Sequence, residues 1–218
     1  DDGCVSDSSR DITIYAPPVA GITSSSATVC EGGGITFSDN SSYAGSSPVS
    51  SWYWDWGNRN PITVTADTPH TKVFDSYGSY TIKHTVKVSD LCIGDTASTT
   101  ITVYAKPNSA FTYPAGCLPA DGIVPFTSTA TAPDGQAITT HNWNFGDAGA
   151  TPANPNTSTD ANPTHTYQFG NYTIQYTVTT ANGCTKDTTV AASFNITPLL
   201  AYGPLPAVCE SVHSPVSV

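Results

Sequence analysis

The six cysteines of this chain form two interleaved series, and both repeat with nearly the same spacing. One series lies in turn-like stretches rich in Asp, Asn and Gly, with intervals of 88 and 92 residues (92 − 4 and 184 − 92), and consists of Cys4, Cys92 and Cys184. The second series has intervals of 87 and 92 residues (117 − 30 and 209 − 117) and consists of Cys30, Cys117 and Cys209. A spacing near 90 residues is close to the length of a small β-sandwich, so the sequence predicts similar domains in tandem.

The composition excludes several classes of protein. With 218 residues, of which 38% are apolar and 11% charged, the chain has enough material for two cores and too little charge for a disordered segment. Its formal net charge of −10 argues against nucleic acid as a partner, because phosphate binding requires clustered Lys and Arg. No apolar stretch approaches the roughly 20 residues needed to cross a bilayer, so we expect no membrane insertion in this segment.

The cysteines also indicate a compartment. They occur at regular positions and never as a Cys-x-x-Cys pair, a pattern that favours disulfides over a zinc site. Disulfides persist in oxidising environments. The sequence therefore predicts a secreted, extracellular location at the cell surface.

Short alternating runs predict the secondary structure. Residues 80–88 and 172–178 alternate apolar and polar side chains and are rich in Thr, Val, Ile and Tyr, which is typical of half-buried strands. Residues 99–103 and 188–192 follow as the next strand of each repeat, after the turn that carries a cysteine. Helical periodicity is absent, and 17 Pro and 17 Gly would interrupt most helices. The predicted fold class is all-β.

Short Pro-containing linkers set the predicted domain boundaries. Tyr15 to Pro17, Tyr104 to Pro107 and Asn195 to Pro198 each close one domain and open the next, and such stiff linkers predict immunoglobulin-like sandwiches arranged end to end. The expected segments are a C-terminal hairpin of a preceding repeat at 1–16, complete repeats at 17–105 and 106–197, and the N-terminal strands of a following repeat at 198–218.

Three motifs recur in a fixed order in the two complete repeats. The first is Trp-Tyr-Trp-Asp-Trp-Gly-Asn at 52–58 and His-Asn-Trp-Asn-Phe-Gly-Asp at 141–147. The second is Pro-Thr-His-Thr-Tyr at 163–167, whose counterpart in the first repeat, His70 to Phe74, has one extra residue. The third is Gly-x-Tyr-Thr-Ile from Gly78 and from Gly170. In these motifs the chain resembles the polycystic kidney disease (PKD) domain family. The resemblance covers nearly the whole chain and implies an immunoglobulin-like β-sandwich.

The aromatic residues of these motifs are expected to serve the fold. Residues two apart in a strand face the same way, so each motif should direct a pair of rings into its sandwich. A tyrosine that follows a glycine at a strand start can pack its ring and tie down the preceding loop with its hydroxyl. The predicted core residues are Trp54, Trp56, Trp143, Phe145, Tyr80 and Tyr172.

No cofactor is expected. Some members of the family that the chain resembles bind calcium through nearby carboxylates, but this sequence departs from the motif at Asn58, Asn144 and Ala148. Asp147 and Asp160 remain as a candidate partial oxygen site, against the ordinary role of capping turns.

The resemblance implies a structural function. Tandem PKD repeats with cysteines at these places are similar to those of large bacterial surface adhesins, including gliding-type proteins exported by the type IX route. We therefore expect a non-catalytic stalk or spacer of an adhesin or filament, with neighbouring repeats of the same chain or fibre as partners. Because PKD modules also accompany secreted proteases and chitinases, a carbohydrate- or matrix-binding accessory module of a secreted hydrolase is the alternative. The five scattered histidines form no recognisable catalytic motif.

Strand placement favours one pairing of the cysteines. In a seven-stranded sandwich the segment before the second strand lies at the exit end, whereas the last hairpin lies at the entry end, on the order of 20 Å away. A disulfide allows a Cα separation of only about 6 Å, so a bond between these two positions of one repeat would be strained. In an end-to-end array the exit end of one repeat meets the entry end of the next, so we expect an inter-domain disulfide between Cys30 of the first repeat and Cys184 of the second. Cys4, Cys92, Cys117 and Cys209 are then expected to pair outside this segment. The rival pairing is Cys30 with Cys92 and Cys117 with Cys184.

Two kinds of surface site remain as candidates. Trp52 and Tyr53 are candidate contacts for a surface glycan or matrix, although Trp52 shares strand parity with Trp54 and would equally well extend the core. Thr96 and Thr188 each follow an Asp just after the hairpin cysteine and resemble the acidic-Thr sites that some surface bacteria O-glycosylate.

Overall fold

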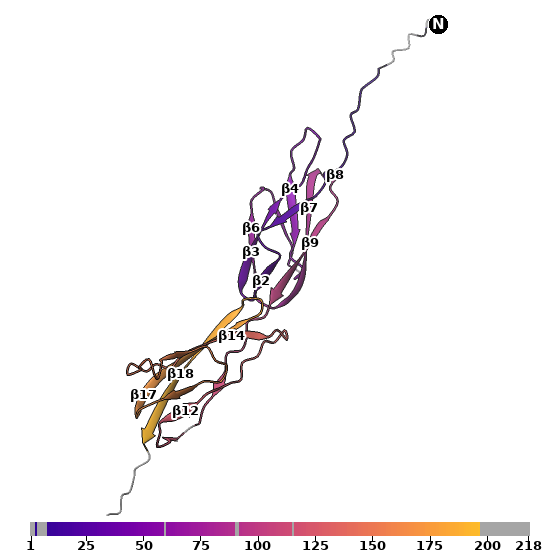
Figure 1. The fold of residues 1–218 in the computed structure, drawn as a ribbon. Helices are drawn as coiled ribbons and strands as arrows, with labels where there is room; N and C mark the ends of the chain where they lie inside the picture. The colour runs from indigo at the N-terminus through magenta and orange to yellow at the C-terminus, as the bar shows by residue number, and fades with distance from the viewer. Residues whose placement is uncertain (1–2, 4–7, 59, 90–91, 115, 197–218) are drawn as a thin grey trace, which may run out of the picture. The chain divides into compact units, whose positions relative to one another are not determined.

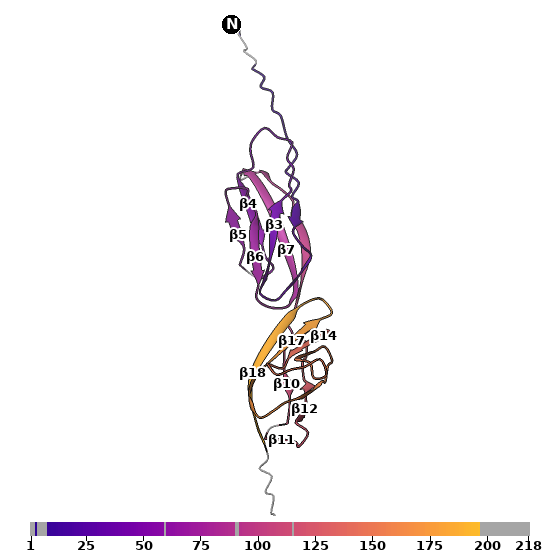
Figure 2. The same cartoon turned by 60° about the vertical axis from the view of Figure 1, so that its left-hand side comes forward.

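The computed structural model describes residues 3, 8–58, 60–89, 92–114 and 116–196. All regular elements in these ranges are β-strands, so the prediction of an all-β fold is confirmed (Figures 1 and 2). Within the same ranges, no helix has the length and apolar character needed to cross a bilayer. The chain folds into two compact units, of which the first comprises residues 1–110, 129–141 and 176–188 and the second the remainder.

The first repeat is built from two sheets. The larger has the order β2-β9-β7-β4-β5, with β8 paired to β7, and the smaller has the order β1-β3-β6. The strands of the larger sheet are β2 (Thr28–Cys30), β4 (Ser51–Asp55), β5 (Ile62–Val64), β7 (Gly78–Ser89), β8 (Cys92–Ile93) and β9 (Ala97–Tyr104). Those of the smaller sheet are β1 (Ile22–Ser24), β3 (Gly33–Asp39) and β6 (His70–Phe74).

Alternation along these strands fills the core between the sheets. Ile82, His84 and Val86 of β7 point inward and are completely buried, as their parity in the sequence requires. Trp54 of β4 and Trp56, which directly follows that strand, are both buried and stack with ring centroids 5.5 Å apart. The buried cluster consists of Ile35, Phe37, Trp54, Trp56, Phe74, Ile82, Ile101 and Val103.

The second repeat has a similar plan. Its main sheet has the order β11-β18-β17-β14-β15, and two further strand pairs, β10 with β13 and β12 with β16, stand where the first repeat has its smaller sheet. The main strands are β11 (Cys117–Leu118), β14 (Ile138–Asn144), β15 (Thr157–Ser158), β17 (Gly170–Thr180) and β18 (Thr185–Ile196). The others are β10 (Phe111–Thr112), β12 (Ile123–Pro125), β13 (Thr127–Ser128) and β16 (Thr164–Thr166).

The core of the second repeat is aromatic. Trp143 and Phe145 are buried, and Phe126 lies 5.5 and 5.4 Å from them between ring centroids. Tyr167 is also buried and lies 4.6 Å from Phe194 of β18. Aromatic pairs at such separations stabilise a core beyond the area that they bury.

A glycine follows the last core aromatic of each motif because the chain must turn tightly there. Gly57 and Gly146 have φ of 73° and 68°, a region that L-residues other than glycine rarely adopt. At Gly146 an added Cβ would also lie 2.3 Å from the carbonyl oxygen of Thr173. The side chains of Asp55 and Asn144 accept hydrogen bonds from the two glycine amides at 2.9 and 3.0 Å and hold both turns.

The tyrosines after Gly78 and Gly170 are half-buried. Tyr80 donates its hydroxyl to the carbonyl of Ser76 at 2.8 Å, and Tyr172 donates to that of Gln168 at 3.2 Å. Both bonds return to the loop four residues earlier, while the ring of Tyr80 lies 4.9 Å from Phe74 of the core.

The strands β1 to β9 fall within the predicted repeat 17–105, and β10 to β18 fall within 106–197. The segment 1–16, for which a hairpin was predicted, contains no strand in its described residues, 3 and 8–16. The predicted strands at 198–218 lie outside the described residues.

Candidate functional site: the Cys30–Cys184 disulfide

Cys30 ends an edge strand. β2 runs parallel to β9, with Cys30 opposite Tyr104, the last residue of the first repeat's final strand. The amide of Glu31 then donates to the carbonyl of Tyr104 at 2.9 Å, which fixes the backbone beside the cysteine. Cys30 is therefore held next to the point at which the chain leaves the first repeat.

Cys184 lies in the tight turn between β17 and β18. Gly183 provides the positive φ of 80° that this turn requires, and the amide of Thr180 donates to the carbonyl of Cys184 at 2.9 Å. The hydroxyl of Thr180 accepts a hydrogen bond from the amide of Cys184 at 3.2 Å. The side chain of Cys184 is buried, with 1% exposed.

Cys30 and Cys184 form a disulfide with a Cα separation of 5.6 Å across 154 positions of sequence. This is the pairing that strand placement predicts, and the rival pairing of Cys30 with Cys92 and Cys117 with Cys184 is wrong. Cys92 and Cys117 carry free thiols among the described residues. Cys4 and Cys209 lie outside the described residues, so the pairing of these four cysteines elsewhere stays a prediction.

The segment that follows β9 is held by acidic side chains. Asp134 accepts a hydrogen bond from the amide of Ala105 at 2.8 Å, and Glu31 accepts one from the amide of Lys106 at 3.2 Å. Burial opposes ionisation of Asp134, but hydrogen bonds from Ala105 and Gln136 outweigh it and lower the pKa of this carboxyl. These charge-assisted bonds anchor the linker beside the disulfide.

Two further residues anchor the end of the linker. Asn108 exchanges backbone hydrogen bonds with Thr131, at 2.7 and 3.2 Å. The buried hydroxyl of Ser109 donates a hydrogen bond to the backbone carbonyl of Tyr176 at 3.0 Å. The backbone carbonyl of Ser109 accepts a hydrogen bond from the hydroxyl of Thr188 at 2.5 Å. All of these linker contacts belong to the first compact unit. The linker is thus fixed by hydrogen bonds as well as by the disulfide.

A buried polar network lies inside the first repeat. His84 is fully buried, stacks on Trp54 at 3.8 Å between ring centroids, and contacts Asp39 through Nε2 at 3.0 Å. Asp39 also accepts hydrogen bonds from the indole of Trp52 at 2.7 Å and from the amide of Ser41 at 2.8 Å. Burial opposes ionisation of Asp39, but the bonds from Ser41, Trp52 and His84 prevail and lower its pKa.

This network has no recognisable signature in the sequence. The parity of His84 with Ile82 and Val86 indicates that the histidine faces inward, but nothing in the sequence indicates that Asp39, 45 positions away, meets it. The arrangement stabilises the fold, because both buried ring nitrogens of His84 have partners, the backbone carbonyl of Tyr53 and the carboxylate of Asp39.

The structure gives Asp147 a role in its turn. One carboxylate oxygen accepts the amide of Gly149 at 2.8 Å, and the other lies 3.1 Å from Nε2 of His165. Asp160 is exposed, and its backbone carbonyl accepts the indole N–H of Trp143. Among the described residues, no group of three or more His, Cys, Asp or Glu is placed to hold a metal ion. Both oxygens of Asp147 thus have partners within the fold, as the turn-capping role predicts.

The two candidate glycan contacts differ in exposure. Trp52 is half-buried, packs against the core cluster and uses its indole N–H on Asp39, so it extends the core. Tyr53, on the opposite side of β4, is 39% exposed. Of the pair, Tyr53 keeps a ring available to a ligand.

The two candidate glycosylation sites also differ. Thr96 is exposed, and its hydroxyl lies 3.1 Å from that of Thr85. Thr188 is half-buried, and its hydroxyl is engaged with Ser109. A modifying enzyme would therefore reach Thr96 more easily than Thr188.

Comparison with known proteins identifies the repeats. Among solved structures, the chain is similar to the PKD1 domain of Vibrio anguillarum Epp (23% identity, TM-score 0.36, covering 43% of this chain and 99% of that chain). It is also similar to the PKD1 domain of the Vibrio cholerae metalloprotease PrtV, with 25% identity and a TM-score of 0.34, covering 41% of this chain and 98% of that chain. The Clostridium thermocellum CbhA fibronectin(III)-like modules are similar as well, with 17% identity and a TM-score of 0.36, covering 85% of this chain and 100% of that chain. No protein with a curated description matches the chain. The sequence model of the PKD domain matches residues 15–103 and 105–195, so the chain belongs to the PKD domain family and carries two of its domains in tandem.

Proposed function

We propose that this chain is a non-catalytic structural spacer of an extracellular surface protein, an adhesin or filament, and that its disulfide carries tension past the folded domains. The observation that supports this most directly is the disulfide between Cys30 and Cys184, which spans 154 positions of sequence.

The covalent path determines where a pulling force acts. When the two ends of the chain are pulled, tension reaches Cys30, crosses the disulfide and leaves at Cys184. The strands from β3 to β17 lie between these cysteines in sequence and are bypassed. Their hydrogen bonds and aromatic cores therefore bear little of the tension, and only the short outer segments and β18 remain exposed to it.

The disulfide also favours an extracellular setting, because such bonds persist in oxidising compartments. Closing a loop of this length stabilises the folded state by about 5 kcal/mol in the chain-entropy model. The anchored linker at 104–109 adds hydrogen bonds from Asp134 and Glu31 next to the disulfide. These features suit a segment that must keep its length under tension.

Replacement in the full-length surface protein tests this proposal. Residues 17–197 would be exchanged for two sandwich domains of unrelated sequence, or for a flexible Gly/Ser linker with the same number of residues. A spacer role predicts that attachment under flow survives the first exchange and fails with the second. Loss of attachment with both, while the surface level of the protein is unchanged, would refute the spacer role and favour a specific ligand.

The alternative, a carbohydrate- or matrix-binding accessory module, has one observation in its favour. Tyr53 presents an exposed ring on the large sheet, and aromatic rings are common sugar platforms. The Tyr53→Ala variant separates the two functions, because it should abolish glycan or matrix binding by an accessory module and leave a spacer unaffected. Val73→Ala, at another exposed apolar side chain of the first repeat, is the matched control.

A further inference from the structure

Cys117 occupies the same structural position in the second repeat as Cys30 in the first. β11 is an edge strand parallel to β18, with Cys117 opposite Asn195, just as Cys30 of β2 lies opposite Tyr104 of β9. Cys30 is bonded to a turn cysteine, whereas Cys117 is exposed and carries a free thiol. Cys117 thus lies where the first repeat has a disulfide-bonded cysteine, but it has no disulfide partner among the described residues.

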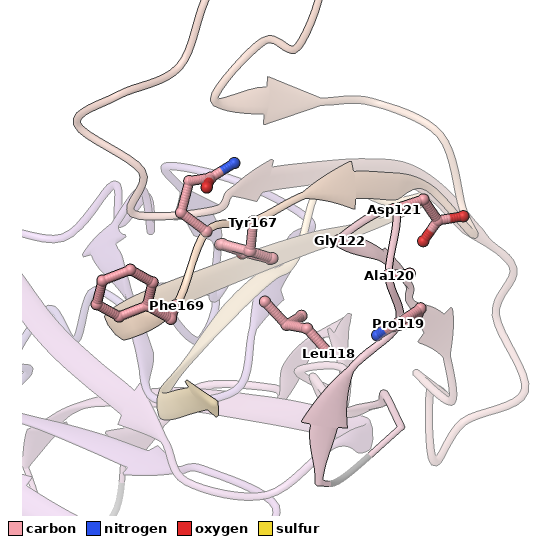
Figure 3. A pocket seen from close by; sticks show the side chains of 8 residues that line it. Leu118, Pro119, Ala120, Asp121, Gly122, Tyr167 and Phe169 are labelled. Atoms are coloured by element: carbon pink, nitrogen blue, oxygen red, sulfur yellow. The ribbon is translucent and has the colours of Figure 1, made fainter. Parts of the chain in front are cut away.

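The surface beside Cys117 is hollow and partly apolar. A cavity of about 120 Å³ lies between the loop 118–122 and residues 167–169. Figure 3 shows Leu118 and Tyr167 in its middle, with Phe169 on one side and the loop from Pro119 to Gly122 on the other.

Apolar side chains lie exposed around this hollow. Phe169 is 69% exposed and Ile123 is 41% exposed. A second, smaller hollow is lined by Cys117 itself, together with Leu118, Ile123 and Phe194. Exposed apolar side chains gathered beside a reactive thiol are a feature of docking sites.

Cys92 is the counterpart of Cys184 in the first repeat. Each cysteine follows the long strand that begins at the Gly-x-Tyr motif shared by the two repeats, β7 for Cys92 and β17 for Cys184. Cys92 is half-buried and carries a free thiol, and it lies within hydrogen-bonding contact of Tyr43.

A hollow of about 300 Å³ lies beside Tyr43, lined by Ala16, Pro17, Val19, Ser42, Tyr43 and Ala44. Val19 is 58% exposed, and Tyr15 nearby in sequence is 44% exposed. The surface near Cys92 is therefore also apolar. Cys92 follows a long strand, as Cys184 does, and in the observed disulfide Cys184 is bonded to Cys30, the cysteine of an edge strand.

We propose that Cys117 and the apolar surface around it form a docking site for the Cys92 end of a second copy of this chain, and that the two copies are joined there by a disulfide. The observed Cys30–Cys184 bond shows that these two cysteine positions are compatible in a single linkage. Because the described residues of each copy hold one free cysteine of each type, Cys92 and Cys117, the association joins unlike ends of the two copies and is head-to-tail. It does not depend on the spacer role, since copies that fail to link would still carry tension singly.

The linkage requires an oxidant, which a small-molecule disulfide such as oxidised glutathione supplies. The thiolate of Cys92 attacks oxidised glutathione, forming a mixed disulfide and releasing one glutathione thiolate. The thiolate of Cys117 of the docked copy then attacks the Cys92 sulfur, forming the Cys117–Cys92 bond and releasing a second glutathione. Two protein thiols are oxidised and one glutathione disulfide is reduced to two thiols.

Complementary variants test the proposal. In a background with Cys4→Ser and Cys209→Ser, the chain with Cys92 and Cys117 intact should form a ladder of multimers in a glutathione redox buffer, on non-reducing gels. The Cys92→Ser and Cys117→Ser variants should each stay monomeric alone. Mixed together, they should give only dimers, whose peptide map joins Cys117 of one variant to Cys92 of the other.

Matched controls separate docking from simple thiol reactivity. A Cys117→Ser chain that carries Gln175→Cys, an exposed position elsewhere in the second repeat, should link to Cys92 about tenfold more slowly, because it lacks the high effective concentration of a docked partner. Phe169→Ser should slow the native linkage, whereas Val73→Ser should not. The proposal would be overturned if the Gln175→Cys chain linked to Cys92 as fast as the native chain does. It would also be overturned if the native chain gave only dimers joined through Cys117 to Cys117, or only monomers whose thiols are capped with glutathione.

Discussion

Breaking the Cys30–Cys184 disulfide should lengthen the chain sharply under tension. With the bond intact, only about 64 residues (218 − 154) lie outside the closed loop, so full extension yields about 200 Å at roughly 3.4 Å per residue. The 154 positions between the cysteines would add about 500 Å once the bond is gone. Force spectroscopy with handles at the two ends of the chain measures both lengths.

The experiment compares two variants. The control replaces Cys4, Cys92, Cys117 and Cys209 by Ser and keeps the one disulfide, and the test variant also replaces Cys30 and Cys184 by Ser. We expect the control to show no unfolding steps from the bypassed strands, and the test variant to show the unfolding of both domains. Adding a reductant should convert the control to the longer behaviour. Equal contour lengths for the two variants would refute the argument that the bond bypasses the domains.

Three further predictions concern the folded domains. Asp39→Ala removes the acceptor of Trp52 and Ser41 and should cost about 2 kcal/mol of unfolding free energy at pH 7 in urea titrations. The lowered pKa of Asp39 adds stability that is present above about pH 4 and is lost as the pH falls through the folded-state pKa. The variant should therefore lose less stability than the parent when the solution is acidified. Gly146→Ala should cost about 2 kcal/mol or more of unfolding free energy, because the positive φ and the carbonyl of Thr173 both oppose a Cβ. The control, Gly149→Ala, should change the melting temperature little. Equal losses of stability in the two variants would contradict the argument from backbone strain at Gly146. Tyr80→Phe removes the hydroxyl that binds Ser76 and should cost about 1 kcal/mol without loss of the packed ring, and an unchanged unfolding midpoint would show that this bond contributes nothing.

Local pattern was enough to predict the strands and much of the cores. The alternation at 80–88 and 172–178 corresponds to β7 and β17, which extend only a few residues beyond it. Trp54, Trp56, Trp143 and Phe145 are buried because residues two apart in a strand share a face, and this follows from backbone geometry alone. The glycines of the motifs are likewise explained by the turns that their φ angles permit.

The pairing of Cys30 with Cys184 was also accessible from the sequence, but only through an assumed strand order. Spacing alone leaves several connectivities open. The parallel pairing of β2 with β9 shows why Cys30 is available to this partner, because it places Cys30 beside Tyr104, where the chain leaves the first repeat.

The sequence by itself determined the repeats, the strands and the inward faces, because these depend on spacing and on the two-residue period of a strand. Only the tertiary structure decided that Trp52 binds Asp39 with His84 and that the hydroxyl of Thr188 is engaged by Ser109. Such contacts join residues 13, 45 and 79 positions apart. They depend on how strands are brought together across sheets, and side-chain polarity along the chain carries no record of which partner each group meets.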